Sequence, residues 1–227
     1  MLDAKELVKE LRAKRNKANI EGMKRFGISG NEVLGISVVD LRALAKKAGR
    51  SHELALELWA TGIHEARIVA SLVDEPAKVT SAQMDRWVAD FDSWDICDQC
   101  CGNLFDKTPF AYEKAIKWSK AKGEFVKRAG FSMMAELAWH DKTATDGKFI
   151  RFLPSIKRGS TDGRNFVKKA VNWALRGIGK RNPKLNAKAI ELAEDIARLD
   201  SKSARWIASD ALRELKSPQV RKRLRGA

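Results

Sequence analysis

Within residues 91–101, a tryptophan and an aspartate are four residues apart, so one face of a helix would carry both side chains. At about 100° per residue, Trp94 and Asp98 lie only about 40° apart around the helix axis. Ser93 precedes them and is expected to cap the helix. A large aromatic face and a carboxylate would therefore project together. The pattern alone favours a simpler interpretation, in which Trp94 belongs to the core and Asp98 is a solvated acid near the helix N-terminus.

A second candidate site is a basic ridge within residues 166–180. Four residues there fall within a helical stripe of roughly 60°; they are Lys169, Trp173, Arg176 and Lys180. Basic side chains on such a ridge suit phosphate contacts, and the indole can stack against a base or a sugar. The same residues equally allow a half-buried Trp173 surrounded by the aliphatic stems of the basic side chains.

Arg128 is a third candidate, because it begins an otherwise apolar helical stretch that continues to Leu137. We expect its guanidinium either to bind a phosphate or to pair with an acid on a neighbouring helix, and the sequence alone favours the acid. Other basic clusters, such as 221–225, fit nonspecific phosphate attraction without locating a site.

Cofactor and metal chemistry finds little support in the sequence. The three cysteines, Cys97, Cys100 and Cys101, have no second pair or nearby histidine to complete a zinc site. We interpret them as small, buried helix residues. No glycine-rich phosphate loop and no dinucleotide-binding motif is present. We therefore expect no metal and no cofactor.

The charge balance points to a polyanionic partner. The 227 residues include 44 Lys and Arg against 29 Asp and Glu, a formal net charge of +15. Nucleic acid is the first candidate and an anionic membrane surface is the rival. No segment approaches the ~20 apolar residues of a membrane span. The charged residues 1–6 carry no apolar run like that of a signal peptide, so we expect a cytoplasmic, nucleoid-associated protein.

Helices must position these candidates, because apolar residues recur at spacings of three and four and sustained strand alternation is absent. Ser37 is expected to begin a helix that Gly49 ends, and Ser51 to begin the next. Pro109 and Pro183 are each expected at a first helical position. The pattern predicts roughly a dozen helices of about 10 to 15 residues.

Helix pairs that recur at about 35 to 45 residues predict stacked helical-hairpin repeats in one all-α domain over residues 1–227. We expect a curved solenoid with a basic concave face. A compact helical bundle is the alternative architecture.

Six sequence blocks, in order, resemble the bacterial DNA alkylation repair glycosylases built from HEAT-like repeats, the AlkD family. They are Leu34–Arg42, His64–Arg67, Ser93–Asp98, Val126–Ala129, Phe166–Arg176 and Lys180–Pro183. The similarity runs from about Gly27 to about Leu215. Each block alone is weakly specific, but their common order and spacing are strongly specific.

The resemblance implies hydrolysis of the N-glycosidic bond of cationic alkylated purines, chiefly 3-methyladenine and 7-methylguanine, in double-stranded DNA without base flipping. It implies HEAT-like repeats with DNA on the concave side, and a monomer is the default. The family's working residues correspond to Trp94, Trp173, Asp98 and Arg128 here, which favours the functional interpretation of each. Lys169, Arg176 and Lys180 would then help Arg128 to hold the DNA backbone.

Two positions depart from the family pattern. Ser93 stands where a second tryptophan is often found, and Gly177 follows Arg176 where an acid is expected. Neither is one of the four working residues, so the departures bear on substrate range. The alternative functions are a noncatalytic binder of damaged or distorted DNA on the same scaffold and a helical-repeat adaptor for proteins. Both tryptophans and Asp98 argue against the first, and the charge of +15 argues against the second.

Overall fold

The protein is all-α, as the sequence predicts. The computed structural model describes residues 3–28, 30 and 32–225. Within these residues no strand forms, and a single parallel β-bridge joins Glu32 to Ile63. None of the helices in the described part of the chain is long and apolar enough to cross a membrane.

The chain divides into two compact units, Met1–Thr108 and Pro109–Ala227. The helices of the first unit are α1 (Ala4–Ala13), α2 (Lys17–Arg25), α3 (Val38–Ala48), α4 (His52–Ala60), α5 (His64–Val73), α6 (Ser81–Ala89) and α7 (Trp94–Asn103), followed by the 3₁₀ turn η1 (Phe105–Lys107). Those of the second are α8 (Ala111–Trp118), α9 (Glu124–His140), α10 (Asp146–Ile150), α11 (Leu153–Gly159), α12 (Asn165–Gly179), α13 (Pro183–Ala197), α14 (Lys202–Leu215) and α15 (Pro218–Arg225).

Two parts of the sequence interpretation are not tested by this division. A single domain over residues 1–227 stays a prediction, as does the basic concave face. Met1 and Leu2, which begin the segment interpreted as lacking a signal peptide, lie outside the described residues.

Helix ends mostly follow the predicted capping residues. Ser37 Oγ accepts a hydrogen bond from the Asp40 N–H at the start of α3, and Gly49 ends that helix with a φ of 81°. Ser51 caps α4 in the same way, and Pro183 is the first residue of α13. These local rules work because a helix start needs an acceptor for its unpaired N–H groups.

The prediction for Pro109 is wrong, because α8 begins two residues later, at Ala111. The N–H and the hydroxyl of Thr108 both donate back to the Phe105 carbonyl, at 3.1 and 2.8 Å. These bonds complete the 3₁₀ turn, so the chain needs a further turn before the next helix.

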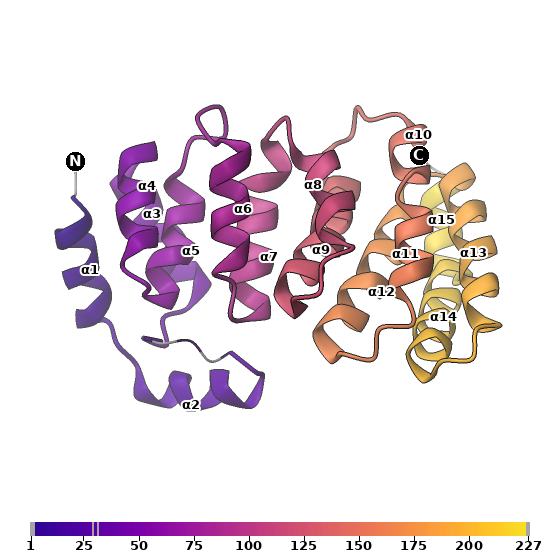
Figure 1. Cartoon of the computed structure of the whole chain (residues 1–227), viewed down its shortest axis with the longest axis horizontal. Helices are drawn as coiled ribbons and strands as arrows, with labels where there is room; N and C mark the ends of the chain where they lie inside the picture. Colours follow the sequence, from indigo (N-terminus) through magenta and orange to yellow (C-terminus); the bar gives the residue numbers. More distant parts are fainter. Residues whose placement is uncertain (1–2, 29, 31, 226–227) are drawn as a thin grey trace. The chain divides into compact units, whose positions relative to one another are not determined.

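In the first unit, α5 packs between α3 and α7, and α4 packs on α5. Figure 1 shows α2 lying crosswise to α1 and α4. The core includes two parallel tryptophan rings, Trp59 of α4 and Trp87 of α6, whose centroids are 3.9 Å apart. Helix α7 itself packs against α5 and η1.

In the second unit, α12 packs against α9, α11, α13 and α14 and is therefore its central helix. Close approach of the neighbouring pair α8 and α9 depends on Gly130, where a Cβ would lie 2.3 Å from the Ser119 nitrogen. Helices α5, α7, α9, α12 and α14 begin at residues 64, 94, 124, 165 and 202. The earlier intervals are thus shorter than the 35 to 45 residues that the sequence predicts.

A buried carboxylate holds the loop before α3. Glu65 of α5 is fully buried and accepts hydrogen bonds from the N–H groups of Leu34, Gly35 and Ile36, at 2.9, 2.7 and 3.3 Å. Gly35 has a φ of 78°, and a Cβ there would lie 2.4 Å from the Asn16 carbonyl oxygen. Glycine is therefore required for three consecutive N–H groups to converge on one carboxylate.

Replacing Glu65 by alanine should leave three buried N–H groups without an acceptor and lower the free energy of unfolding by about 3 kcal/mol. Glu65→Gln keeps one acceptor oxygen, so its free energy of unfolding should fall by less. Urea unfolding measures both. The control is Glu57→Ala on the exposed side of α4, and an equal loss in that variant would contradict the assignment.

Candidate functional site

Helix α7 places Trp94 and Asp98 on one face, as predicted. Both side chains are half-buried. The opposite side of the helix is fully buried, through Ile96 and the three cysteines. Gln99 and Asn103 complete the accessible face. The helix therefore presents an aromatic ring and a carboxylate side by side, and both side chains are partly accessible to solvent.

The indole of Trp94 is oriented by a residue that sequence reasoning missed. Trp94 Nε1 donates a hydrogen bond of 2.9 Å to the carbonyl oxygen of Phe26, which follows the last residue of α2. Phe26 is itself 71 % exposed. No spacing signal connects residues so far apart in the chain, so only the fold reveals this contact.

The start of α7 is fixed by a second contact that the sequence did not predict. His64 Nε2, at the start of α5, lies 2.8 Å from Asp95 Oδ2, and His64 is only 2 % exposed. Its other ring nitrogen, Nδ1, is buried without a hydrogen-bond partner among the described residues, so Asp95 orients the ring. Because Asp95 adjoins Trp94, this pair fixes the first turn of α7 against α5.

Ser93 occupies the predicted N-cap position but makes a different bond. Its hydroxyl donates to Asp95 Oδ1 at 2.8 Å and does not accept a backbone N–H of α7. Ser93 is fully buried. The serine that departs from the family pattern thus supports the second oxygen of the same carboxylate.

Both members of the pair have shifted pKa values. Burial lowers the pKa of His64, but the hydrogen bond and negative charge of Asp95 outweigh it, so the pKa lies above 6.5. Burial raises the pKa of Asp95, but the hydrogen bond from His64 outweighs it, so the pKa lies below 3.8. The interaction therefore favours the charged form of each group.

Arg128 lies near the start of α9 and is 5 % exposed. Its Nη1 donates a hydrogen bond of 2.6 Å to the carbonyl oxygen of Phe166, the second residue of α12. The neighbouring Lys127 pairs with Asp162 at 3.1 Å. Arg128 thus has a backbone acceptor as a partner, and its binding of phosphate stays a prediction.

Helix α12 carries the predicted basic ridge, but two of its cations already have acidic partners. Arg176 Nη1 lies 2.6 Å from Glu214 Oε2, and Lys180 Nζ lies 2.6 Å from Glu214 Oε1. Asp210, also on α14, lies 3.5 Å from Arg176. These acids come from a helix about 35 residues further along the chain, which a helical wheel of α12 does not include.

The remaining ridge residues are more available. Lys169 is exposed and makes no ion pair with any described residue. Trp173 is half-buried, and its indole has neither a hydrogen bond nor a ring contact within the described part of the chain. Gly177, where the family pattern has an acid, faces α9, since a Cβ there would lie 3.6 Å from Ala138 Cβ.

The seven predicted residues therefore form two sets, one in each unit. Trp94 and Asp98 share α7 in the first unit. The second unit contains Arg128, Lys169, Trp173, Arg176 and Lys180. The assignment of a catalytic or DNA-binding role to each stays a prediction.

The three cysteines are free and buried on the inner side of α7, as the sequence predicts. Burial raises the pKa of the Cys100 and Cys101 thiols. Such thiols are poor nucleophiles and pack as small apolar groups. Among the described residues, no group of three or more His, Cys, Asp or Glu side chains could hold a metal ion.

Comparison with known proteins gives consistent results. The family model for the DNA alkylation repair enzymes matches residues 7–215. The uncharacterized protein Lin0241 of Listeria innocua is 24 % identical over 203 residues, which cover 88 % of each chain. A solved structure from a family related to the HEAT-like repeat DNA glycosylases, with affinity for branched DNA structures, superposes with a TM-score of 0.79 at 22 % identity, covering 98 % of this chain and 96 % of that one. The fold is therefore the HEAT-like repeat fold.

The His64–Asp95 pair should make stability depend on pH. The contribution from His64 is fully present below its unfolded value of 6.5 and is lost as the pH rises through the raised folded value. The contribution from Asp95 is present above 3.8 and is lost as the pH falls through the lowered folded value. Asp95→Asn should therefore cost most stability between about pH 4 and 6.5 and progressively less on either side.

Chemical unfolding at several pH values measures this difference, and NMR titration of His64 should show a lower pKa in Asp95→Asn. Asp200→Asn, at a fully exposed position, is the control. A difference that stays constant from pH 5 to pH 9 would rule out the charged pair.

Proposed function

The chain belongs to the DNA alkylation repair enzyme family, and from that membership we propose that it is a monofunctional DNA glycosylase. The proposed reaction is hydrolysis of the N-glycosidic bond of cationic alkylated purines in duplex DNA, without base flipping. The proposed substrates are 3-methyladenine and 7-methylguanine. The proposal includes action as a monomer, associated with the nucleoid.

The observation that carries the proposal is the accessible face of α7, with Trp94 and Asp98 side by side and the helix start held by buried polar contacts. A cationic purine is already a good leaving group and needs no general acid. What remains is to stabilise an oxocarbenium-like sugar and to position water. Asp98 supplies negative charge beside the sugar and orients the water.

The tryptophans explain a preference for cationic lesions. The π faces of Trp94 and Trp173 attract a cationic base or an electron-poor sugar by roughly 0.5 to 2 kcal/mol per contact. Neutral bases gain less from the same rings. Arg128 and Lys169 hold the backbone, and Arg176 and Lys180 add to this when a phosphate competes with Glu214.

A noncatalytic binder of damaged or distorted DNA is the second candidate function. It is favoured by the solved relative, whose family is described as having affinity for branched DNA structures. On this alternative, Trp94 and Trp173 sense distortion and Asp98 has no chemical role. The two functions differ in whether free base is released.

Asp98→Asn keeps the shape of the side chain but removes its charge, so base release from methylated duplex DNA should fall by about 10²–10³-fold while DNA binding is retained. Mass spectrometry of the released base measures activity, and fluorescence anisotropy measures binding. Asp200→Asn, also a single aspartate neutralised, is the control and should release base at the wild-type rate.

If Asp98→Asn releases base as fast as wild type, the electrostatic role of Asp98 is wrong. If wild type itself releases no base but binds the DNA tightly, the noncatalytic binder replaces the glycosylase.

Glu214→Gln should strengthen binding to damaged and undamaged duplex alike, because Arg176 and Lys180 lose the carboxylate that phosphate must displace. The slope of log affinity against log salt concentration should steepen by about 1 to 2. The control is Glu194→Gln, which removes the same charge from an exposed residue paired with Lys216 at 2.8 Å. An equal gain in both variants would assign the effect to net charge and exclude a specific competition.

A further inference from the structure

A shallow groove in the first unit has no role in the function described above. It lies along α3 and α5 and has a volume of about 330 Å³. Its lining residues are Arg42, Ala45, Lys46, Gly49, Arg50 and Leu72. Three of the six are cations and none is acidic. Arg42, Lys46 and Arg50 are exposed, so the groove is open to solvent.

The three cations of this groove, unlike Arg176 and Lys180 on α12, have no acidic side chain as a partner within the described residues. Arg42 Nη2 donates to the amide oxygen of Asn103 at 3.3 Å. Arg50 Nη1 donates to a backbone carbonyl oxygen, that of Asp74, at 2.6 Å. Lys46 has no polar partner among the described residues. The groove therefore keeps its full positive charge.

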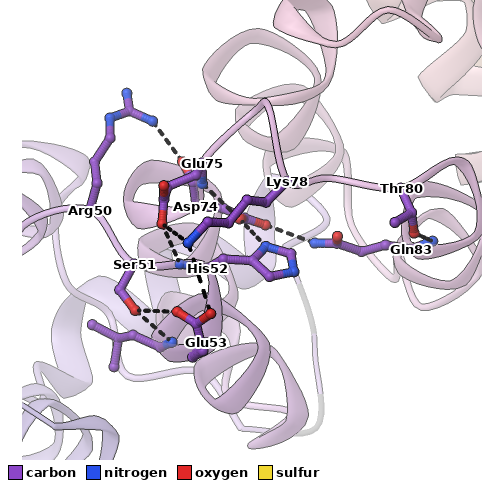
Figure 2. A network of polar contacts seen from close by, with 10 residues as sticks. Arg50, Ser51, His52, Glu53, Asp74, Glu75, Lys78, Thr80 and Gln83 are labelled. Atoms are coloured by element: carbon purple, nitrogen blue, oxygen red, sulfur yellow. Dashed lines mark hydrogen bonds and ion pairs between the residues drawn. The ribbon is translucent and has the colours of Figure 1, made fainter.

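Asp74 is a buried residue whose carbonyl oxygen meets Arg50 of the groove, and its carboxylate already has other partners. Figure 2 shows Asp74 between His52 and Gln83, whose Nδ1 and Nε2 lie 2.7 Å from its two oxygens. The same figure shows Arg50 reaching only the main chain at Asp74. Asp74 is fully buried, so its carboxylate does not replace an external anion in the groove.

The spacing of the cations suits a chain of phosphates. Arg42 and Lys46 are four residues apart on α3, so their backbone positions are separated by about 6 Å along the helix axis. One DNA strand advances about 3.4 Å per nucleotide. Two neighbouring or next-but-one phosphates can therefore contact the two side chains at once, so the pair suits a polyanion.

The groove is also connected to the face of α7 that carries Asp98. Asn103, the partner of Arg42, donates in turn to Gln99 Oε1 at 2.9 Å, and both belong to the accessible face of α7. Helix α5 packs between α3 and α7. Asn103 lies five residues beyond Asp98, about 7.5 Å along the axis of α7, so the groove begins roughly two nucleotides from Asp98.

We propose that the groove lined by Arg42, Lys46 and Arg50 binds the phosphodiester backbone of duplex DNA, beginning about two nucleotides from the nucleotide at Trp94 and Asp98. The position along the DNA rests on the proposed function of α7. Binding of the backbone itself does not, because phosphates carry no information about a lesion. The groove thus supplies affinity for undamaged DNA and sets the register of the duplex.

The first experiment compares Arg42→Gln/Lys46→Gln with wild type in binding undamaged duplex DNA at several salt concentrations. Loss of two phosphate contacts should reduce the slope of log affinity against log salt by about 2. The matched control is Lys5→Gln/Lys9→Gln, two exposed lysines with the same i, i+4 spacing on α1 that do not line this groove. An unchanged slope in the groove variant, or an equal change in the control, overturns the proposal.

A second experiment uses duplexes with one alkylated base, built in the Asp98→Asn background so that binding alone is measured. One set extends ten base pairs on both sides, and two others stop one base pair from the lesion on one side or the other. The variant with Arg42→Gln/Lys46→Gln should bind the long duplex more weakly than its Asp98→Asn parent. The two proteins should bind equally well to one truncated duplex only, the one that lacks the phosphates contacted by the groove. If the groove variant loses the same affinity on all three duplexes, a phosphate contact at a fixed distance from the lesion is excluded.

A third measurement separates DNA from a free anion as the source of the phosphate. Inorganic phosphate is titrated into the protein, and the amide resonances of Lys46 and Gly49 are followed. Submillimolar binding of phosphate together with an unchanged DNA salt slope would assign the groove to a small anion and overturn the proposal. All three measurements read binding, so they remain valid if base release is not observed.

Discussion

The buried pair of His64 and Asp95 is the contact on which the α7 site depends. Two ionisable groups out of water are costly, and their attraction repays that cost only when the geometry is good and the other polar atoms are satisfied. Here the geometry is good and the second carboxylate oxygen is satisfied by Ser93, whereas Nδ1 of His64 has no hydrogen-bond partner among the described residues. The pair therefore fixes where α7 begins relative to α5, and the positions of Trp94 and Asp98 follow from the rigidity of one helix.

His64 and Glu65, two consecutive residues of α5, hold two different parts of the first unit. His64 holds the start of α7, and Glu65 gathers the backbone of the loop at Gly35. That loop in turn anchors α2, because Asn19 Nδ2 donates to the Gly35 carbonyl oxygen at 2.9 Å. The end of α2 provides the acceptor for the Trp94 indole. One turn of α5 thus controls both the backbone and the ring orientation of the tryptophan.

The net charge of +15 is not equally available over the molecule. Glu214 of α14 binds Arg176 and Lys180, two of the predicted phosphate-binding cations, so a phosphate there would gain only the difference between two ionic contacts. Arg42 of α3 and Arg50, just after that helix, have neutral acceptors, and a charged phosphate accepts a stronger hydrogen bond than these. On the proposed function, the distribution of acidic partners, more than the number of lysines and arginines, decides where the DNA backbone is held most strongly.

The sequence by itself determined the all-α class, most helix starts, and the shared face of Trp94 and Asp98. All of these are set within one helical turn, by hydrogen bonds and angles between residues at most four positions apart. Periodicity also predicted the hairpin repeats, and ordered motifs identified the family. The local rules failed at Pro109, where a bond from Thr108 to Phe105 completed another turn first.

Only the tertiary structure decided which charges remain available and what holds the site. The contacts of Trp94 with Phe26, of His64 with Asp95, and of Arg176 with Glu214 join residues about 30 to 70 positions apart. Such pairs leave no periodic signal in one sequence, because they depend on which helices pack together and on the side of each helix that faces its neighbour. The sequence therefore specified the chemical groups, and helix packing selected their partners.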